Sequence, residues 1–117
     1  MKLIIAGTRT LSPTSDFILD AGYMLKIGTP TEIVSGKSKG VDAAGEAFAK
    51  RQDLPVKEFP ADWELYGTKA GPIRNAKMAM YADALLLIWD GSSKGSQSMK
   101  NEMKKLNKPV YEIIVKV

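Results

Sequence analysis

The stretch that decides the fold is Ala84-Leu85-Leu86-Leu87-Ile88-Trp89-Asp90-Gly91-Ser92-Ser93-Lys94-Gly95-Ser96. Residues 84–89 are continuously apolar, which is expected of a central strand in a parallel sheet that is covered on both faces. Residues 90–98 form a loop rich in glycine and serine, and Met99, Met103 and Leu106 then mark a helix. A buried strand, a glycine-rich loop and a helix in this order indicate an α/β protein.

The rest of the chain continues this alternation. Short apolar runs predict further strands at residues 2–7, 31–35, 55–59 and 109–115. A first helix is expected to start at Ser12 and Pro13, because a hydroxyl followed by proline is a common helix start. The apolar residues that follow at helical spacing are Phe17, Ile18, Ala21, Met24 and Leu25.

Two more helices are predicted between these strands. Residues 42–51 form one of them, and Pro72 opens the other. The residues of the latter that would face inward are Ile73, Ala76 and Met80. Residues 60–71, which precede it, are expected to be an irregular loop.

Strand and helix thus alternate, without a linker or repeat, over a single domain of residues 1–117. This alternation predicts an α/β, Rossmann-like three-layer fold: a five-stranded parallel sheet of order 3-2-1-4-5 with helices on both faces. In such sheets ligands bind at the carboxyl ends of the strands, near the point where the strand order reverses. The loops after the first, second and fourth strands are therefore the candidates for a site.

The amino-acid composition limits the kinds of active site, metal site and ligand that are possible. The chain contains no cysteine and no histidine, which nearly excludes a hydrolytic triad or a zinc site of the usual kind. Its net charge of +4 favours anionic ligands but is too small to imply duplex DNA. The apolar runs are too short to cross a membrane and no signal-peptide layout is visible, so we expect a cytoplasmic protein without a membrane partner.

The loop after the first strand contains Gly7, Thr8 and Arg9. A glycine at the end of a buried strand lets the backbone approach a ligand, and the hydroxyl and guanidinium that follow suit a phosphate. The structural alternative is a simple turn from strand to helix with an exposed arginine.

The loop after the second strand contains Ser35, Gly36, Lys37, Gly40 and Asp42. Glycines, hydroxyls and lysines at a helix N-terminus make a plausible anion cradle. The glycine spacing of a P-loop is missing, however, so we exclude an ATPase. The aspartate is interpreted either as a first-turn carboxylate favoured by the helix dipole or as a contact to a ribose hydroxyl.

The loop after the fourth strand carries the strongest signal. Asp90, Gly91, Ser92, Gly95 and Ser96 stand between a buried strand and a helix, where backbone N–H groups can form a phosphate nest. A flexible surface loop is the alternative. We favour a binding role because parallel sheets place their ligands here.

Arg74 and Asn75 lie in the first turn of a predicted helix, where cations are normally disfavoured. Either an anionic ligand or a salt bridge to Asp62 or Glu64 would explain the arginine. Two aromatic residues in the preceding loop would either stack on a base or cover the edge of the sheet. These residues are Trp63 and Tyr66.

Together these loops resemble the SLOG superfamily, named for the DNA-processing Smf/DprA proteins and the Lonely Guy enzymes, and most of all its small YpsA-related branch. Six short motifs carry the resemblance, in the family's order and over almost the whole chain. They are Gly7-Thr8-Arg9, residues 35–42, Pro60-Ala61-Asp62-Trp63, Gly71-Pro72-Ile73-Arg74-Asn75, Ala82-Asp83, and residues 89–96.

The resemblance implies a domain that recognises nucleotides, nucleoside phosphates or ADP-ribose-like molecules. Lonely Guy enzymes cleave the N-glycosidic bond of nucleoside 5′-monophosphates with a glutamate that ends their glycine-rich motif. Met99 stands at the matching position here, and methionine cannot do that work. The branch also has small residues where Lys37 and Lys39 stand, which implies more positive charge around the ligand.

We therefore expect a binding module that senses or sequesters a phosphate-bearing nucleotide or derivative, such as an ADP-ribose-like or cyclic nucleotide signal. No catalytic residue, metal ligand or cofactor is predicted. One alternative is a hydrolase of N-glycosidic or phosphate bonds that uses Asp90, Asp42 or Asp62. Another is a protein that binds single-stranded nucleic acid, which is less favoured because no stacking row of aromatics is evident. The resemblance also implies a homo-oligomer.

Overall fold

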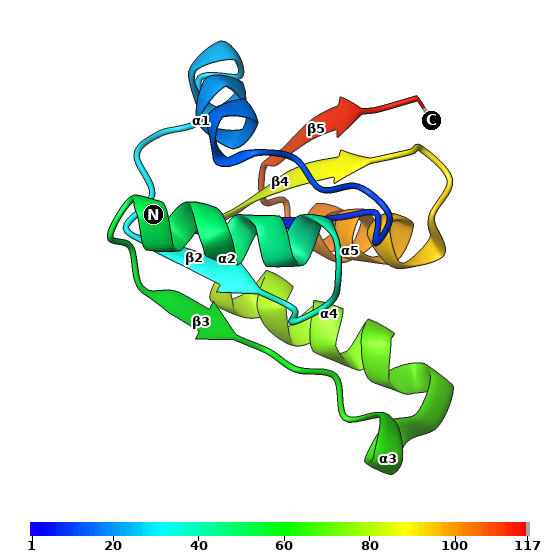
Figure 1. Ribbon diagram of the computed structural model, residues 1–117. Coiled ribbons are helices and arrows are strands. Elements are labelled where there is room, and N and C mark those ends of the chain that lie inside the picture. Colours follow the sequence, from blue (N-terminus) through cyan, green and yellow to red (C-terminus); the bar gives the residue numbers. More distant parts are fainter. Residues whose placement is uncertain (117) are drawn as a thin grey trace.

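The computed structural model describes residues 1–116 and contains a five-stranded, fully parallel sheet of order β3-β2-β1-β4-β5 (Figure 1). The strands are β1 Lys2–Gly7, β2 Glu32–Ser35, β3 Val56–Glu58, β4 Ala84–Trp89 and β5 Val110–Ile114. The predicted fold class and strand order are therefore confirmed. The predicted central strand, residues 84–89, matches β4 at both ends.

The core follows from the apolar runs of the two central strands. Leu86 and Ile88 of β4 pack in a cluster on one face of the sheet, and Leu85 and Leu87 pack in a cluster on the other. All residues of β4 are buried. A strand that is buried on both faces must be apolar at every position, which is why the run 84–89 shows no alternation.

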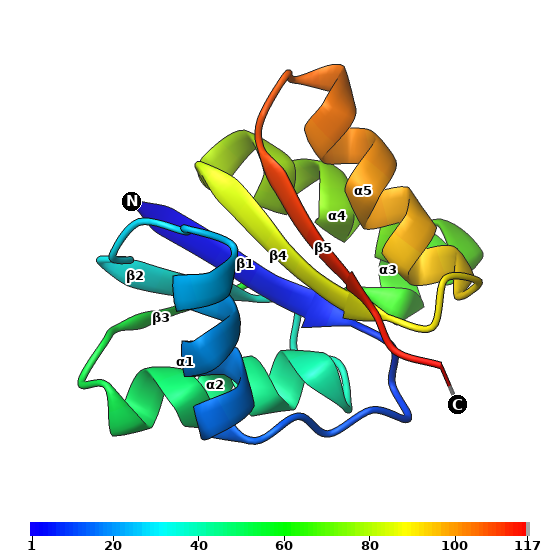
Figure 2. The same cartoon turned by 90° about the horizontal axis from the view of Figure 1, so that it is seen from above.

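Helices cover both faces of the sheet (Figure 2). On one face lie α1 Ser15–Met24 and α2 Val41–Arg51; on the other lie α4 Ala70–Tyr81 and α5 Lys94–Lys105. A short helix, α3 Trp63–Tyr66, and a 3₁₀ turn, Gly67–Lys69, lead into α4. Within the part of the chain described, no helix is both long and apolar enough to span a membrane.

Two predicted helix starts were wrong. The first helix begins at Ser15, after Thr14, whose hydroxyl accepts the N–H of Phe17 at 3.0 Å and so caps the helix. Residues 60–71 are not an irregular loop, since they contain α3, the 3₁₀ turn and the start of α4. Pro72 is the third residue of α4, where proline is tolerated because N–H groups of the first turn have no partner within the helix.

Some residues predicted to face inward are exposed. Met80 is 73% exposed, while its neighbours Met78 and Ala79 are buried. Met24 is 82% exposed, and Leu106 lies just past the end of α5 at 44% exposure. The helical period of α4 was recognised correctly, but the face that turns toward the sheet was misjudged.

Candidate functional site

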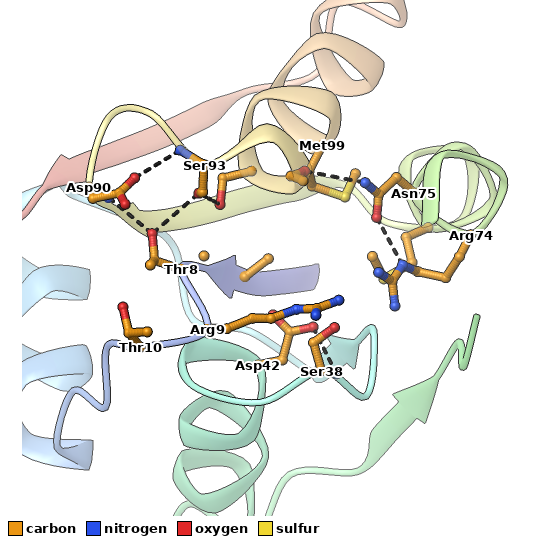
Figure 3. A pocket seen from close by; sticks show the side chains of 15 residues that line it. Thr8, Arg9, Thr10, Ser38, Asp42, Arg74, Asn75, Asp90, Ser93 and Met99 are labelled. Atoms are coloured by element: carbon orange, nitrogen blue, oxygen red, sulfur yellow. Dashed lines mark hydrogen bonds between the residues drawn. The ribbon is translucent and has the colours of Figure 1, made fainter. Parts of the chain in front are cut away.

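A cavity of about 360 Å³ lies at the carboxyl ends of β1 and β4 (Figure 3). Its walls come from the end of β1 and the loop after it, the start of α2 and the segment before it, α4, and the loop after β4 with the first turns of α5. We call it the first cavity. The residues that line it are Ala6, Gly7, Thr8, Arg9, Thr10, Ser38, Asp42, Arg74, Asn75, Met78, Asp90, Ser93, Gly95, Ser96 and Met99.

The structure brings together residues from all three loops in which a site was expected, those after β1, β2 and β4, although they are far apart in sequence. The predicted residues that line the first cavity are Gly7, Thr8, Arg9, Asp42, Arg74, Asn75, Asp90, Gly95 and Ser96. Those that do not line it are Ser35, Gly36, Lys37, Gly40, Asp62, Trp63, Gly91 and Ser92. Binding by the first group stays a prediction.

Sequence reasoning missed several residues of this lining. Ser38 and Ser93 belong to loops that were recognised, but no pattern distinguishes them from their neighbours. Met78 and Met99 line the cavity from α4 and α5 although only 1% and 2% of their surface is exposed. The contribution of Met78 follows from the positions of two helices on the same face of the sheet, which a linear sequence does not reveal. The resemblance had already singled out Met99, as the residue at the position of the Lonely Guy glutamate.

The loops after β1 and β4 are held together by short polar contacts. The buried hydroxyl of Thr8 accepts the N–H of Asp90 at 3.0 Å and lies 3.3 Å from the hydroxyl of Ser93. The Asp90 carboxylate in turn accepts the N–H groups of Ser92 and Ser93, each at 2.9 Å. These contacts order the turn that leads into α5.

These hydrogen bonds also determine the acidity of Asp90. The N–H groups of Ser92 and Ser93 hold the pKa of its carboxyl below the ordinary value, because they stabilise the charged form. A carboxylate that is so engaged is a weak base. These bonds give Asp90 an ordering role in the loop.

Two helices begin at the first cavity without a side-chain cap. Gly40 precedes α2 with a φ of 73°, and Ser93 precedes α5 with its hydroxyl donated to Ser96 at 2.8 Å. Neither residue accepts a backbone N–H of its helix through a side chain. The first N–H groups of a helix have no partner within the helix, and they carry partial positive charge. The start of α5, including Gly95, therefore presents donors to the cavity.

Arg74 is held in place by hydrogen bonds to two residues, one of which is in turn bonded to α5. Its Nη1 donates to the carbonyl of Gly36, and its Nε donates to Oδ1 of Asn75 at 2.9 Å. The amide of Asn75 donates to Ser98 Oγ at 3.2 Å and to Gly95 O at 3.3 Å. Gly36 leaves room for the guanidinium, since a Cβ there would lie 2.7 Å from Arg74 Nη1. Gly36, which was predicted to bind the ligand, thus lies outside the cavity and helps to position Arg74.

The guanidinium of Arg74 is only partly balanced by nearby charge. Burial lowers its pKa, Asp42 raises it and Arg9 lowers it again. Arg9 extends across the cavity toward Arg74 (Figure 3). Among residues 1–116 neither arginine forms a salt bridge, so Arg74 does not pair with Asp62 or Glu64. Two cations that face one cavity repel each other, and an anion between them would relieve that repulsion.

Asp42 lies at the bottom of this arrangement and is 5% exposed. Its Oδ2 accepts the N–H of Ser38 at 3.3 Å. Burial raises the pKa of its carboxyl, and the Ser38 N–H and Arg74 oppose that rise. Asp62, in contrast, caps α3 by accepting the N–H of Leu65 at 3.1 Å. Asp42 thus combines a raised pKa with a place in the cavity, whereas Asp62 lies outside it.

Lys37 points away from the cavity into a separate ion-pair cluster. Its Nζ lies 3.1 Å from Glu46 and 2.9 Å from Glu58. These carboxylates raise the pKa of Lys37. Ser35 joins the cluster by donating to Glu46 at 2.6 Å. Within residues 1–116, no three acidic side chains gather closely enough to hold a metal ion.

No protein-family model and no curated protein matches this sequence. Among solved structures, the chain resembles DNA processing protein A (DprA) from Streptococcus pneumoniae, with a TM-score of 0.74 at 16% identity. The match covers 99% of this chain and 51% of the DprA chain, so the protein spans about half the length of that relative. At this identity the likeness establishes the fold. The chain therefore shares the Rossmann-like α/β fold of the matching part of DprA.

Proposed function

We propose that the first cavity binds the phosphate of a nucleotide or nucleotide derivative, and that the protein senses or sequesters this ligand. One observation carries the proposal. Arg9 and Arg74 line the same cavity without forming a salt bridge in the described chain, beside the uncapped N-terminus of α5. Guanidinium groups and helix N-termini are both favourable partners of phosphate.

The rest of the first cavity suits an organic phosphate better than a bare anion. Its volume of about 360 Å³ lies within the range of pockets that hold small organic ligands. Ala6, Met78 and Met99 contribute an apolar part, and methionine makes favourable contacts with aromatic rings. A base or sugar can therefore occupy this part while the phosphate lies near the arginines.

Replacing either arginine should weaken binding of a nucleoside monophosphate. Arg9→Ala and Arg74→Ala each remove charge-assisted hydrogen bonds worth about 1.5–3 kcal/mol, or roughly ten- to a hundredfold in affinity. Titration calorimetry with AMP measures the effect. The matched control is Arg51→Ala, which removes an exposed arginine at the end of α2, outside the cavity. Unchanged affinity in both cavity variants would contradict the proposal.

Single-stranded nucleic acid is the second candidate ligand, and the similarity to a DNA-processing protein favours it. The same phosphate-binding groups would then hold the backbone of a strand. Competition distinguishes the two cases. AMP that displaces a short oligonucleotide places both in the first cavity, whereas an oligonucleotide that stays bound uses another surface.

We expect no efficient cleavage of nucleoside monophosphates to the free base. Met99 lines the cavity where the Lonely Guy motif has its glutamate, and Glu102, one turn later, pairs with Lys105 at 3.1 Å outside the cavity. Stabilising a cationic sugar and activating water needs well-placed carboxylates. Incubation with AMP, GMP, CMP and UMP, followed by chromatography of the free base, tests this. Turnover that disappears in Asp42→Asn would show that the protein is an enzyme.

A further inference from the structure

A second cavity, of about 310 Å³, adjoins the first one. Arg74 lines both cavities, so its side chain stands at the boundary between them. The second cavity lies between the end of β3 with the segment after it, α3, and α4. Its walls include Phe59, Tyr66, Ile73 and Lys77. None of the functions considered above uses it.

The second cavity has an aromatic wall and two cations, Arg74 and Lys77. Two acidic residues also line it: Glu58, which pairs with Lys37, and Asp62, which caps α3. Tyr66 is 40% exposed, and Phe59 is half-buried, with its ring centroid 5.4 Å from that of Tyr81. Lys77 follows Arg74 by three residues on α4, so the two cations share one face of the helix. Lys77 forms no salt bridge within residues 1–116. Aromatic rings beside cations are the groups on which nucleic-acid bases stack next to their phosphates.

Arg74 has N–H groups at this boundary that can still donate hydrogen bonds to a ligand. A guanidinium carries five N–H donors, and the structure shows bonds from Nη1 to Gly36 and from Nε to Asn75. These bonds fix the plane of the group and leave N–H groups on Nη1 and Nη2. A phosphate that links an occupant of the first cavity to one of the second would pass beside them.

We propose that the site takes two nucleotide units joined by a phosphodiester, with the second base stacked on Tyr66 in the second cavity. This inference rests on the proposed function, since the first phosphate is held in the first cavity. Trp63, the other aromatic in this segment, does not line the second cavity. Its Cη2 would lie 3.5 Å from a Cβ at Gly71, so it packs over the start of α4.

Calorimetry with two 5′-phosphorylated probes, dAMP and the dinucleotide pdApdA, tests the inference. The dinucleotide should bind more tightly than dAMP, by about five- to a hundredfold for one stacked base. Tyr66→Ala should remove this gain and leave the affinity for dAMP unchanged, while Tyr66→Phe should retain the gain. Tyr23→Ala is the control for loss of a surface tyrosine, because Tyr23 is 75% exposed on α1 and lines neither cavity.

The outcomes separate this inference from the proposed function. If dAMP binds but pdApdA binds no more tightly, or if Tyr66→Ala keeps the gain, the two-unit site is wrong and the proposed function stands. If neither probe binds, the proposed function fails. If pdApdA does show the gain, a 5′-phosphorylated octanucleotide distinguishes a free dinucleotide from single-stranded nucleic acid as the natural ligand. An affinity equal to that of pdApdA indicates a free dinucleotide. A further gain that also depends on Tyr66 indicates single-stranded nucleic acid.

Discussion

Gly7→Ala should destabilise the protein by about 3–5 kcal/mol, although it adds a single carbon. A Cβ at Gly7 would overlap the carbonyl oxygen of Ile88, lie 2.7 Å from its carbonyl carbon and lie 3.0 Å from Val41 Cγ2. The strands β1 and β4 would have to separate, and the bond from the Thr8 N–H to the Ile88 carbonyl, 3.2 Å long, would be lost. Overpacking costs about 1–3 kcal/mol and a broken buried hydrogen bond a similar amount.

A loss of this size is a large part of a typical total stability of about 5–15 kcal/mol. The midpoint of thermal unfolding should fall by about 10 °C or more, as measured by circular dichroism. Gly22→Ala is the matched control, because a Cβ at Gly22, within α1, meets no atom within 4 Å. Alanine there should stabilise the helix slightly. A Gly7→Ala protein that melts with the wild type would show that β1 and β4 can separate at little cost.

The fold could be predicted because its signals are local. A continuous apolar run such as residues 84–89 identifies a buried strand by itself, and the alternation of strands with helices leaves few possible topologies. The location of the cavity followed from the same logic, since parallel strands end at one edge of the sheet. This is why residues as distant as Arg9, Asp42 and Arg74 were expected to belong together, and the structure places all three in one lining.

The direction of individual side chains could not be predicted in the same way. Lys37 stands between two glycine-containing stretches of a binding loop, yet it turns toward Glu46 and Glu58, which the sheet brings beside it. Trp63 was expected either to stack on a base or to cover the edge of the sheet, and the structure places it and Asp62 outside the first cavity. The direction of such a side chain depends on partners from other helices and strands, which cannot be identified from the sequence of one loop.

Gly95→Val should reduce the affinity for AMP by about two orders of magnitude or more without loss of stability. Gly95 is in the first turn of α5 and lines the first cavity, and a Cβ there meets no protein atom within 4 Å. The added methyl groups therefore project into open space beside the N–H groups that we expect to hold the phosphate. Displacing the ligand from two such bonds, at about 1.5–3 kcal/mol each, accounts for the loss.

The stability of the Gly95→Val protein separates a blocked site from a damaged fold. Valine has a somewhat better helix propensity than glycine, by a few tenths of a kcal/mol, so the unfolding midpoint should stay the same or rise slightly. Gly22→Val is the matched control: it adds the same side chain at another open helical glycine that does not line the first cavity, and it should leave AMP binding intact. If Gly95→Val binds AMP as tightly as the wild type does, the phosphate does not approach the start of α5. Arg9 and Arg74 would then have to hold it from the other side of the cavity.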